Sequence, residues 1–326
     1  MQITKNTNNL YIRLLSISSA IIAIILVAQL FIYSTSPLHS KSEQKAIELG
    51  SRALTPAILI PESLTFSDEM VPLSNQIVKE SLDRELLVNA YWQSQTLLFI
   101  KRANRYFPII EPILKAQGVP DDFKYLALIE SSFLPRAVSG SGAVGIWQFM
   151  ERTGREYGLE INKEIDERYN IEKSTIAACK YLKNAKERLG NWTLAAASYN
   201  AGQAGIHNQT TRQKNNSYYN LFLNEETSRY VYRILAAKVI LSNPDKYGFI
   251  VDESEKYPVW STKDIEIKGG ISDLAQFAID NGITYKELKE LNPWLRDNIL
   301  SNINNKSYTI KIIQNQTGTD AESFIN

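Results

Sequence analysis

Between residues 76 and about 248, apolar residues recur at helical spacing with almost no strand-like alternation. The pattern begins with Val78, Leu82 and Leu86 and continues through several further stretches. Alternating, β-prone residues return only after Tyr257, where two short segments flank two helical stretches. This distribution predicts a mainly α fold over 76–250, followed by a small β-α-α-β module at 262–314.

Proline, glycine and capping residues divide the helical region. Pro108 is expected to break the first helical run, and Gly118 to end the piece that follows it. Pro120 begins the next helix, which is expected over 123–131. Three more helices are expected further along the chain, at 174–189, 191–199 and 226–241.

The N-terminus carries an apolar run from Leu14 to Tyr33, and its length of about twenty residues suits a bilayer core. Lys5 and Arg13 precede it, which predicts that the rest of the chain lies outside the cytoplasm. The run has no small-x-small cleavage site, which favours a signal-anchor that is kept, although the sequence leaves its later cleavage open. The expected segments are a cytoplasmic tip with a transmembrane helix over 1–35, a linker over 36–75 with a short helix around 43–53, and a tail over 315–326.

Charge and cysteine content exclude several functions. The 36 basic and 35 acidic residues nearly cancel, so no global field attracts nucleic acid. Cys179 is the single cysteine and has no partner for an intramolecular disulfide. With only His39 and His207 beside it, the sequence offers no Cys/His set for zinc. We therefore expect no metal, no cofactor and no nucleic-acid partner, while protein partners stay unspecified.

Glu130 is the strongest candidate for chemistry. On the helix expected over 123–131 it shares one face with Phe123, Leu126 and Ala127, so a carboxyl group continues an apolar stripe. Burial raises the pKa of a carboxyl group, which suits a general acid at neutral pH. The alternative is a helix-end glutamate that reaches solvent or pairs with Arg136.

Four motifs follow one another in a fixed order. They read Glu130-Ser131-Ser132-Phe133, Gly145-Ile146-Trp147-Gln148 with Met150, Ser198-Tyr199-Asn200-Ala201-Gly202, and Glu226-Thr227-Ser228-Arg229-Tyr230. This series resembles the lytic transglycosylases of glycoside hydrolase family 23, also called SLT-domain enzymes, and looks closest to the membrane-bound lytic murein transglycosylase D group. The resemblance covers roughly residues 76–248 and implies a lysozyme-like, α-helical catalytic domain.

The resemblance also implies a reaction. Glu130 would be the sole catalytic carboxylate: it protonates the oxygen that leaves C1 of N-acetylmuramic acid, then accepts a proton from the 6-hydroxyl of the same sugar. The β-1,4 bond to N-acetylglucosamine breaks without water, and the product carries a 1,6-anhydromuramic acid end. The expected setting is the bacterial cell envelope, with a helix in the inner membrane and the enzyme in the periplasm acting on peptidoglycan strands. The residues expected to bind substrate are Ser139, Gln148, Met150, Tyr199, Asn200, Glu226 and Tyr230.

The last module, Ile265 to Ile312, resembles a LysM domain that holds glycans containing N-acetylglucosamine, with a purely structural domain as the alternative. Two other functions compete with the leading one: a lysozyme-type hydrolase on the same fold, and a catalytically silent protein that only binds peptidoglycan. Outside the motifs, Asp166, Glu167 and Arg168 are expected to form a salt-bridged structural turn, and Trp147 is expected to pack in the core.

Overall fold

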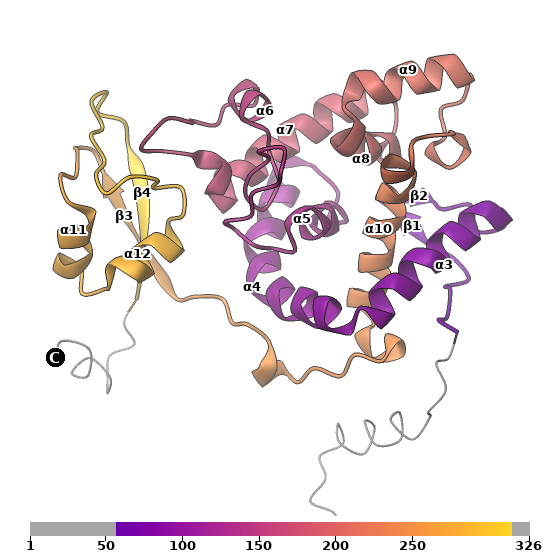
Figure 1. The fold of residues 1–326 in the computed structure, drawn as a ribbon, viewed down its shortest axis with the longest axis horizontal. Coiled ribbons are helices and arrows are strands. Elements are labelled where there is room, and N and C mark those ends of the chain that lie inside the picture. Colours follow the sequence, from indigo (N-terminus) through magenta and orange to yellow (C-terminus); the bar gives the residue numbers. More distant parts are fainter. Residues whose placement is uncertain (1–56, 315–326) are drawn as a thin grey trace, which may run out of the picture. The chain divides into compact units, whose positions relative to one another are not determined.

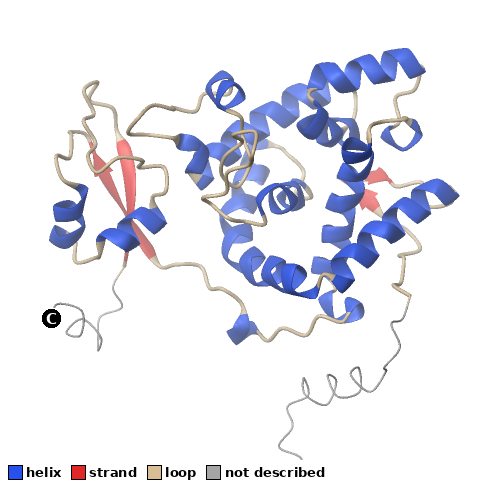
Figure 2. Ribbon diagram, viewed as in Figure 1, coloured by secondary structure: helices blue, strands red, loops and turns tan. Residues whose placement is uncertain are grey.

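The computed structural model describes residues 57–314 (Figures 1 and 2). The part before residue 260 is almost entirely helical, and a strand pair follows it. The helices are α3 (Gln76–Tyr91), α4 (Gln93–Gln117), α5 (Phe123–Ser131), α6 (Glu151–Glu156), α7 (Ile171–Leu189), α8 (Trp192–Ala201), α9 (Gln203–Gln213) and α10 (Glu225–Ser242). Short 3-10 turns lie at Glu167–Tyr169, Tyr218–Asn220, Pro244–Tyr247 and Glu253–Glu255. The expected mainly α fold is confirmed.

Asparagine side chains fix where most of the long helices begin. Asn170 accepts a hydrogen bond from the Lys173 amide at the start of α7, and Asn224 accepts one from the Thr227 amide at the start of α10. Such caps satisfy amide groups that have no partner inside the helix. At the other end, Gly190 adopts a left-handed conformation and closes α7.

The helix α5 occupies the middle of the helical region, with α4, α7, α8 and α10 around it (Figure 1). Phe123, Leu126 and Ala127 are completely buried there. These are the residues whose spacing predicts one apolar face, so the orientation of α5 is as expected.

The expected break at Pro108 is wrong. The chain bends at Trp92, which ends α3 and precedes α4, and α4 then runs through both Pro108 and Pro112. A proline inside a helix removes one hydrogen bond. Here the flanking residues Ile110 and Leu114 are completely buried, and their packing keeps the helix continuous across the lost bond.

The part of the expected linker that the structure describes, residues 57–75, packs against the helical domain. It contains a short hairpin of β1 (Thr65–Phe66) and β2 (Glu69–Met70). Phe66 is completely buried and meets Phe123 edge to face. The carboxylate of Glu69 accepts hydrogen bonds from the Trp192 and Thr193 amides at the start of α8. This segment is therefore part of the domain instead of a tether.

The expected membrane helix and the short helix around 43–53 lie outside the described residues. Within 57–314, none of the helices combines the length and the apolar character needed to cross a bilayer. The helix α9, Gln203–Gln213, follows α8 directly and was not expected, because its sequence is largely polar.

The C-terminal module has the expected β-α-α-β order. It consists of β3 (Thr262–Ile267), α11 (Leu274–Asp280), α12 (Tyr285–Leu291) and β4 (Tyr308–Ile313). The two strands pair antiparallel, with Thr262 opposite Ile313 and Ile267 opposite Tyr308. Leu274, Leu288 and Ile310 form its core together with neighbouring apolar residues.

The C-terminal module contacts the loop between α6 and α7. Ile165 pairs with Leu295 in an isolated β-bridge, and the Asp166 amide donates to the Trp294 carbonyl at 2.9 Å. Ile165 and Tyr169 belong to the same buried apolar cluster as the module's own core. The described helical domain and the module therefore share packed side chains.

Candidate active site

Glu130 lies in the last turn of α5, one residue before the helix ends. Its carboxyl oxygen accepts a hydrogen bond from the hydroxyl of Tyr230 on α10, a tyrosine whose exposed fraction is only 2%. Arg136 does not pair with Glu130, because its guanidinium binds Glu290 and the Lys289 carbonyl in the C-terminal module. The alternative of a Glu130–Arg136 pair is therefore wrong.

Burial dominates the electrostatics of Glu130. The pKa of its carboxyl is raised from the ordinary 4.5 to about 7: desolvation is the largest cause, the Tyr230 hydrogen bond and the Arg233 charge lower the pKa, and the Glu226 charge raises it. A carboxyl group with a pKa near 7 is populated in both protonation states at neutral pH. That is the condition for a group that first donates and then accepts a proton.

Two other predicted residues, Asn200 on α8 and Glu226 on α10, are hydrogen-bonded to each other. The Asn200 amide donates to the Glu226 carboxylate at 3.0 Å, and its carbonyl oxygen accepts from the Thr227 hydroxyl at 2.8 Å. These bonds connect the end of α8 to the first turn of α10. Asn200 and Glu226 therefore connect α8 to α10, the helix that carries Tyr230.

Tyr199 connects α8 to the loop before α6. Its hydroxyl donates to the Trp147 carbonyl at 2.8 Å, and its ring lies against Phe149 and Tyr181. The negative charge of Glu130 contributes to a pKa of Tyr199 well above 10.0, after desolvation as the main cause. Tyr199 is therefore close enough to Glu130 to sense its charge. Trp147 is completely buried, as expected.

The loop from Ser139 to Met150 holds the remaining predicted residues. The Ser139 hydroxyl accepts from the Ala143 amide at 2.9 Å, and the Gln148 amide donates to the Gly145 carbonyl at 2.8 Å. Both side chains thus shape the loop, and neither hydrogen-bonds Glu130 in the described structure. Met150 is exposed at the start of α6. The structure brings Glu130, Tyr199, Asn200, Glu226 and Tyr230 together, and leaves Ser139, Gln148 and Met150 on this adjoining loop.

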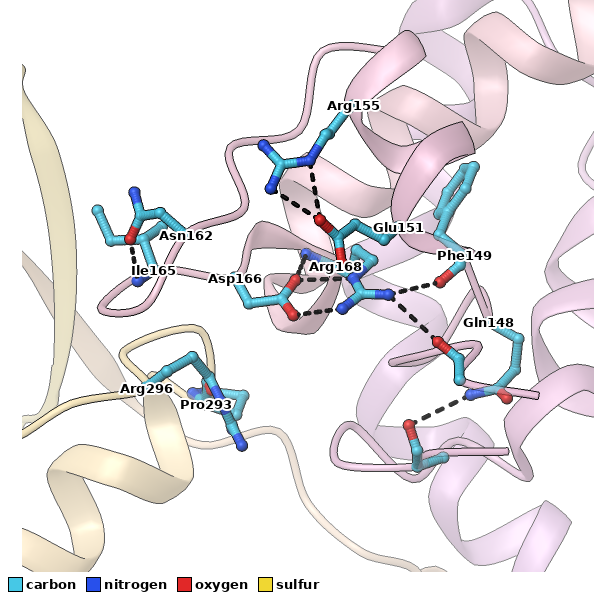
Figure 3. Close-up of polar contacts among 12 residues, drawn as sticks. Gln148, Phe149, Glu151, Arg155, Asn162, Ile165, Asp166, Arg168, Pro293 and Arg296 are labelled. Atoms are coloured by element: carbon cyan, nitrogen blue, oxygen red, sulfur yellow. Dashed lines mark hydrogen bonds and ion pairs between the residues drawn. The ribbon is translucent and has the colours of Figure 1, made fainter. Parts of the chain in front are cut away.

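Arg168 hydrogen-bonds to the backbone of this loop, a role that the motifs do not predict. Figure 3 shows its guanidinium between the Asp166 carboxylate and the Phe149 carbonyl. The guanidinium donates to Asp166 at 2.7 Å and to Phe149 at 3.3 Å. Both side chains of this ion pair are buried, so the salt-bridged turn is confirmed and also holds the motif loop. Gly145 lies so close that a Cβ at its position would be 2.0 Å from the Arg168 carbonyl oxygen.

A cavity of about 550 Å³ lies at the end of α5 in the described structure; Glu130 itself is not among its lining residues, but Ile129, directly before it, is. Ile129 and Ser132 contribute to it from α5 and its end, and Glu226 and Arg229 from α10. The opposite wall comes from the junction of α3 and α4, which the motif search did not single out; its residues include Asn89, Trp92 and Gln95. The only feature of the sequence that points to this wall is Trp92, a large aromatic residue followed by the polar residues Gln93, Ser94 and Gln95.

A second cavity, of about 350 Å³, lies between the helical domain and the C-terminal module, and none of its lining residues is a predicted site residue. Among residues 57–314 no three His, Cys, Asp or Glu side chains gather as a metal site would require. Cys179 is buried, and desolvation raises the pKa of its thiol to about 12, so it remains protonated.

Comparison with known proteins matches two segments to domain families. Residues 107–222 match the transglycosylase SLT domain, and residues 263–316 match the soluble lytic transglycosylase C-terminal LysM-like domain. The first match contains Glu130, Gln148, Tyr199 and Asn200, and ends before Glu226.

Membrane-bound lytic murein transglycosylase D of Escherichia coli K12 is 29% identical over 231 residues, which are 69% of this chain and 50% of that protein. Membrane-bound lytic murein transglycosylase C of Haemophilus ducreyi is 23% identical over 51% of this chain and 51% of its own. The chain thus spans about half the length of these relatives. The X-ray structure of an inactive mutant of lytic transglycosylase Slt from Pseudomonas aeruginosa aligns with a TM-score of 0.32 and 19% identity, covering 68% of this chain and 38% of that one. The chain therefore carries an SLT transglycosylase domain and a LysM-like C-terminal domain, and is homologous to membrane-bound lytic murein transglycosylase D.

Proposed function

We propose that this protein is a lytic transglycosylase that cleaves peptidoglycan glycan strands in the bacterial cell envelope, with Glu130 as acid and then base on a lysozyme-like domain. The observation that carries the proposal is the partly buried Glu130 carboxyl, whose pKa of about 7 fits both steps, beside a cavity lined by the same helices. The SLT domain match and the homology to a named murein transglycosylase support the substrate class.

In the proposed reaction, protonated Glu130 donates its proton to the bridging oxygen, and the bond between that oxygen and C1 of N-acetylmuramic acid breaks. The neighbouring N-acetyl group stabilises the positive charge that develops at C1. The 6-hydroxyl then bonds to C1 and its proton passes to the Glu130 carboxylate. One bond breaks, one forms, and no water enters, so the acid is regenerated with a 1,6-anhydro ring.

Tyr230 is the proposed positioning residue for Glu130, since its hydroxyl holds one carboxyl oxygen and leaves the other for the sugar. Tyr199, Asn200 and Glu226 maintain this arrangement from α8 and α10. Ser139, Gln148 and Met150 would act on substrate from the loop. The proposed location, a periplasmic enzyme with an inner-membrane anchor over 1–35, follows from the N-terminal sequence and from the names of the relatives.

The test is to incubate the full chain with purified peptidoglycan and determine the masses of the released muropeptides. We expect anhydromuropeptides, and a rate that falls about 10²- to 10⁴-fold in the Glu130→Gln variant. Glu187→Gln removes the same charge from an exposed position on α7 and should leave the rate unchanged. Products heavier by one water would instead identify a lysozyme-type hydrolase, and no products would favour a peptidoglycan-binding protein.

A further inference from the structure

The wall of the active-site cavity opposite α10 contains an exposed aromatic ring. Trp92 lies between α3 and α4 and keeps 60% of its surface exposed, although large aromatic side chains are usually covered. It lines the same cavity as Ile129 and Ser132, the residues on either side of the segment that carries Glu130. A sugar bound across Glu130 and extending along this cavity would therefore meet the indole.

The backbone of Trp92 is held on both sides. Its amide donates to the Val88 carbonyl at 2.9 Å, and its carbonyl accepts from the Gln95 and Thr96 amides, both at 3.1 Å. The buried Thr96 hydroxyl donates to the Asn89 carbonyl at 2.6 Å and closes the junction. The indole thus projects from a fixed turn, and a ligand that stacks on it does not have to order a loop.

Two uncharged polar side chains, Asn89 and Gln95, line the cavity beside the Trp92 ring. The Gln95 amide donates to the Ser132 hydroxyl at 2.7 Å, and the Asn89 amide donates to the Glu85 carbonyl at 2.8 Å. The side-chain nitrogens of Asn89 and Gln95 therefore both donate a hydrogen bond. Their side-chain oxygens accept none within the described residues. These oxygens can accept from the N–H or hydroxyl groups of a ligand.

Two of the three carboxylates that line this cavity are ion-paired, and the third, Glu226, accepts a hydrogen bond from the Asn200 amide. Glu85 binds the Arg229 guanidinium at 2.7 Å, and Glu225 binds Arg84 at 3.3 Å. An aromatic face, two amide oxygens that accept no hydrogen bond within residues 57–314, and carboxylates that are mostly ion-paired favour an uncharged polar ligand over an ion. A hexopyranose with an acetamido group has this chemistry: an apolar ring face for stacking and an N–H donor beside it.

We propose that Trp92, with Asn89 and Gln95, forms an N-acetylhexosamine-binding platform that extends the active-site cavity along the junction of α3 and α4. This inference rests on the proposed function, because it assumes that a glycan strand occupies the cavity beside Glu130. The platform holds a sugar away from the bond that is cut, so it contributes to the binding of longer strands and leaves the proton transfers at Glu130 unchanged.

The experiment measures binding of N-acetylglucosamine oligomers of increasing length by calorimetry, with the full chain carrying Glu130→Gln so that no cleavage occurs. We expect Trp92→Ala to weaken binding of the longer oligomers about three- to tenfold, with Trp92→Tyr retaining most of the affinity. Trp260→Ala is the matched control, since Trp260 is 38% exposed and does not line this cavity. Because Trp92 is exposed, its replacement should not lower the unfolding midpoint, which is measured alongside.

The proposed platform is overturned if the parent and Trp92→Ala bind the oligomers with equal affinity. It is also overturned if Trp260→Ala loses as much affinity as Trp92→Ala, or if the parent binds no oligomer. Loss of peptidoglycan binding in Trp92→Ala without loss of oligomer binding would also overturn it and would indicate that the ring contacts the peptide stem. The products released by the unmodified chain decide the proposed function separately: anhydro ends with an unchanged Trp92→Ala affinity would refute the platform alone.

Discussion

Burying the Glu130 carboxyl group has a cost in folding free energy that depends on pH. Its pKa is 4.5 in the absence of burial and about 7 in the folded chain. Between these values the folded state binds a proton that the unfolded state has released, so the free energy of unfolding falls as pH rises through this window. At about 1.4 kcal/mol for each pKa unit, the loss approaches about 3 kcal/mol above pH 7.

Glu130→Gln should therefore be more stable than the parent in a pH-dependent way. Glutamine has nearly the same shape and no charge to desolvate, so the variant should gain up to about 3 kcal/mol at pH 8 and almost nothing at pH 4. Urea denaturation at both pH values measures the difference. The exposed Glu187→Gln on α7 should show no such gain; a Glu130→Gln advantage of the same size at both pH values would contradict the raised pKa.

The loop that carries Gln148 packs closely against the backbone of Arg168 at one residue, Gly145. Gly145 has a φ of +80°, and a Cβ at its position would overlap the Arg168 carbonyl oxygen at 2.0 Å. Any side chain would push the loop away from the buried Arg168–Asp166 pair that holds it. The packing of the loop against the turn at 167–169 therefore requires glycine here.

Gly145→Ala should destabilise the fold by about 2–4 kcal/mol, since it combines backbone strain with a steric overlap that the buried ion pair cannot relieve. Gly140→Ala is the control in the same loop, because a Cβ at Gly140 meets nothing within 4 Å and its φ is not positive. Chemical denaturation gives both values. If the two variants lost the same free energy, the close contact with Arg168 would not be the cause.

Helices could be predicted where periodicity and caps agreed. The apolar stripe and Gly190 defined α7, and the stripe through Phe123 and Leu126 placed Glu130 correctly on α5. The break at Trp92 and the continuous course of α4 through Pro108 could not be predicted, because tertiary packing outweighs the local penalty of proline. The polar helix α9 has no stripe to detect.

Parts of the candidate site that depend on contacts between distant segments could not be predicted from the sequence. Arg168 contacts the loop at Phe149, and Trp92 lines the cavity at the end of α5 from the junction of α3 and α4. These residues share no local motif with the residues they approach, so spacing along the chain carries no signal for them. The four motifs predicted the residues on α5, α8 and α10, and the walls of the cavity emerged only from the fold.

At the scale of the whole described chain, the C-terminal module is joined to the helical domain through the loop before α7. Ile165 is only 3% exposed and lies in the module's apolar cluster, while its backbone pairs with Leu295. Ion pairs between Glu160 and Lys306, at 2.9 Å, and between Arg136 and Glu290, at 3.1 Å, accompany this contact. Exposed pairs of this kind add little free energy, so the apolar contact dominates.

This packing predicts that the described helical domain and the module unfold together in one transition, because neither can open without exposing the shared cluster. Ile165→Asp would place a carboxylate in that cluster, cost about 3–5 kcal/mol and separate the transition into two steps. Ile303→Asp makes the same change at a position that is 87% exposed in the module, and should leave one transition. Scanning calorimetry of the full chain distinguishes the cases; two transitions in the parent would mean that the two domains are energetically independent and that the apolar contact at Ile165 does not join their unfolding.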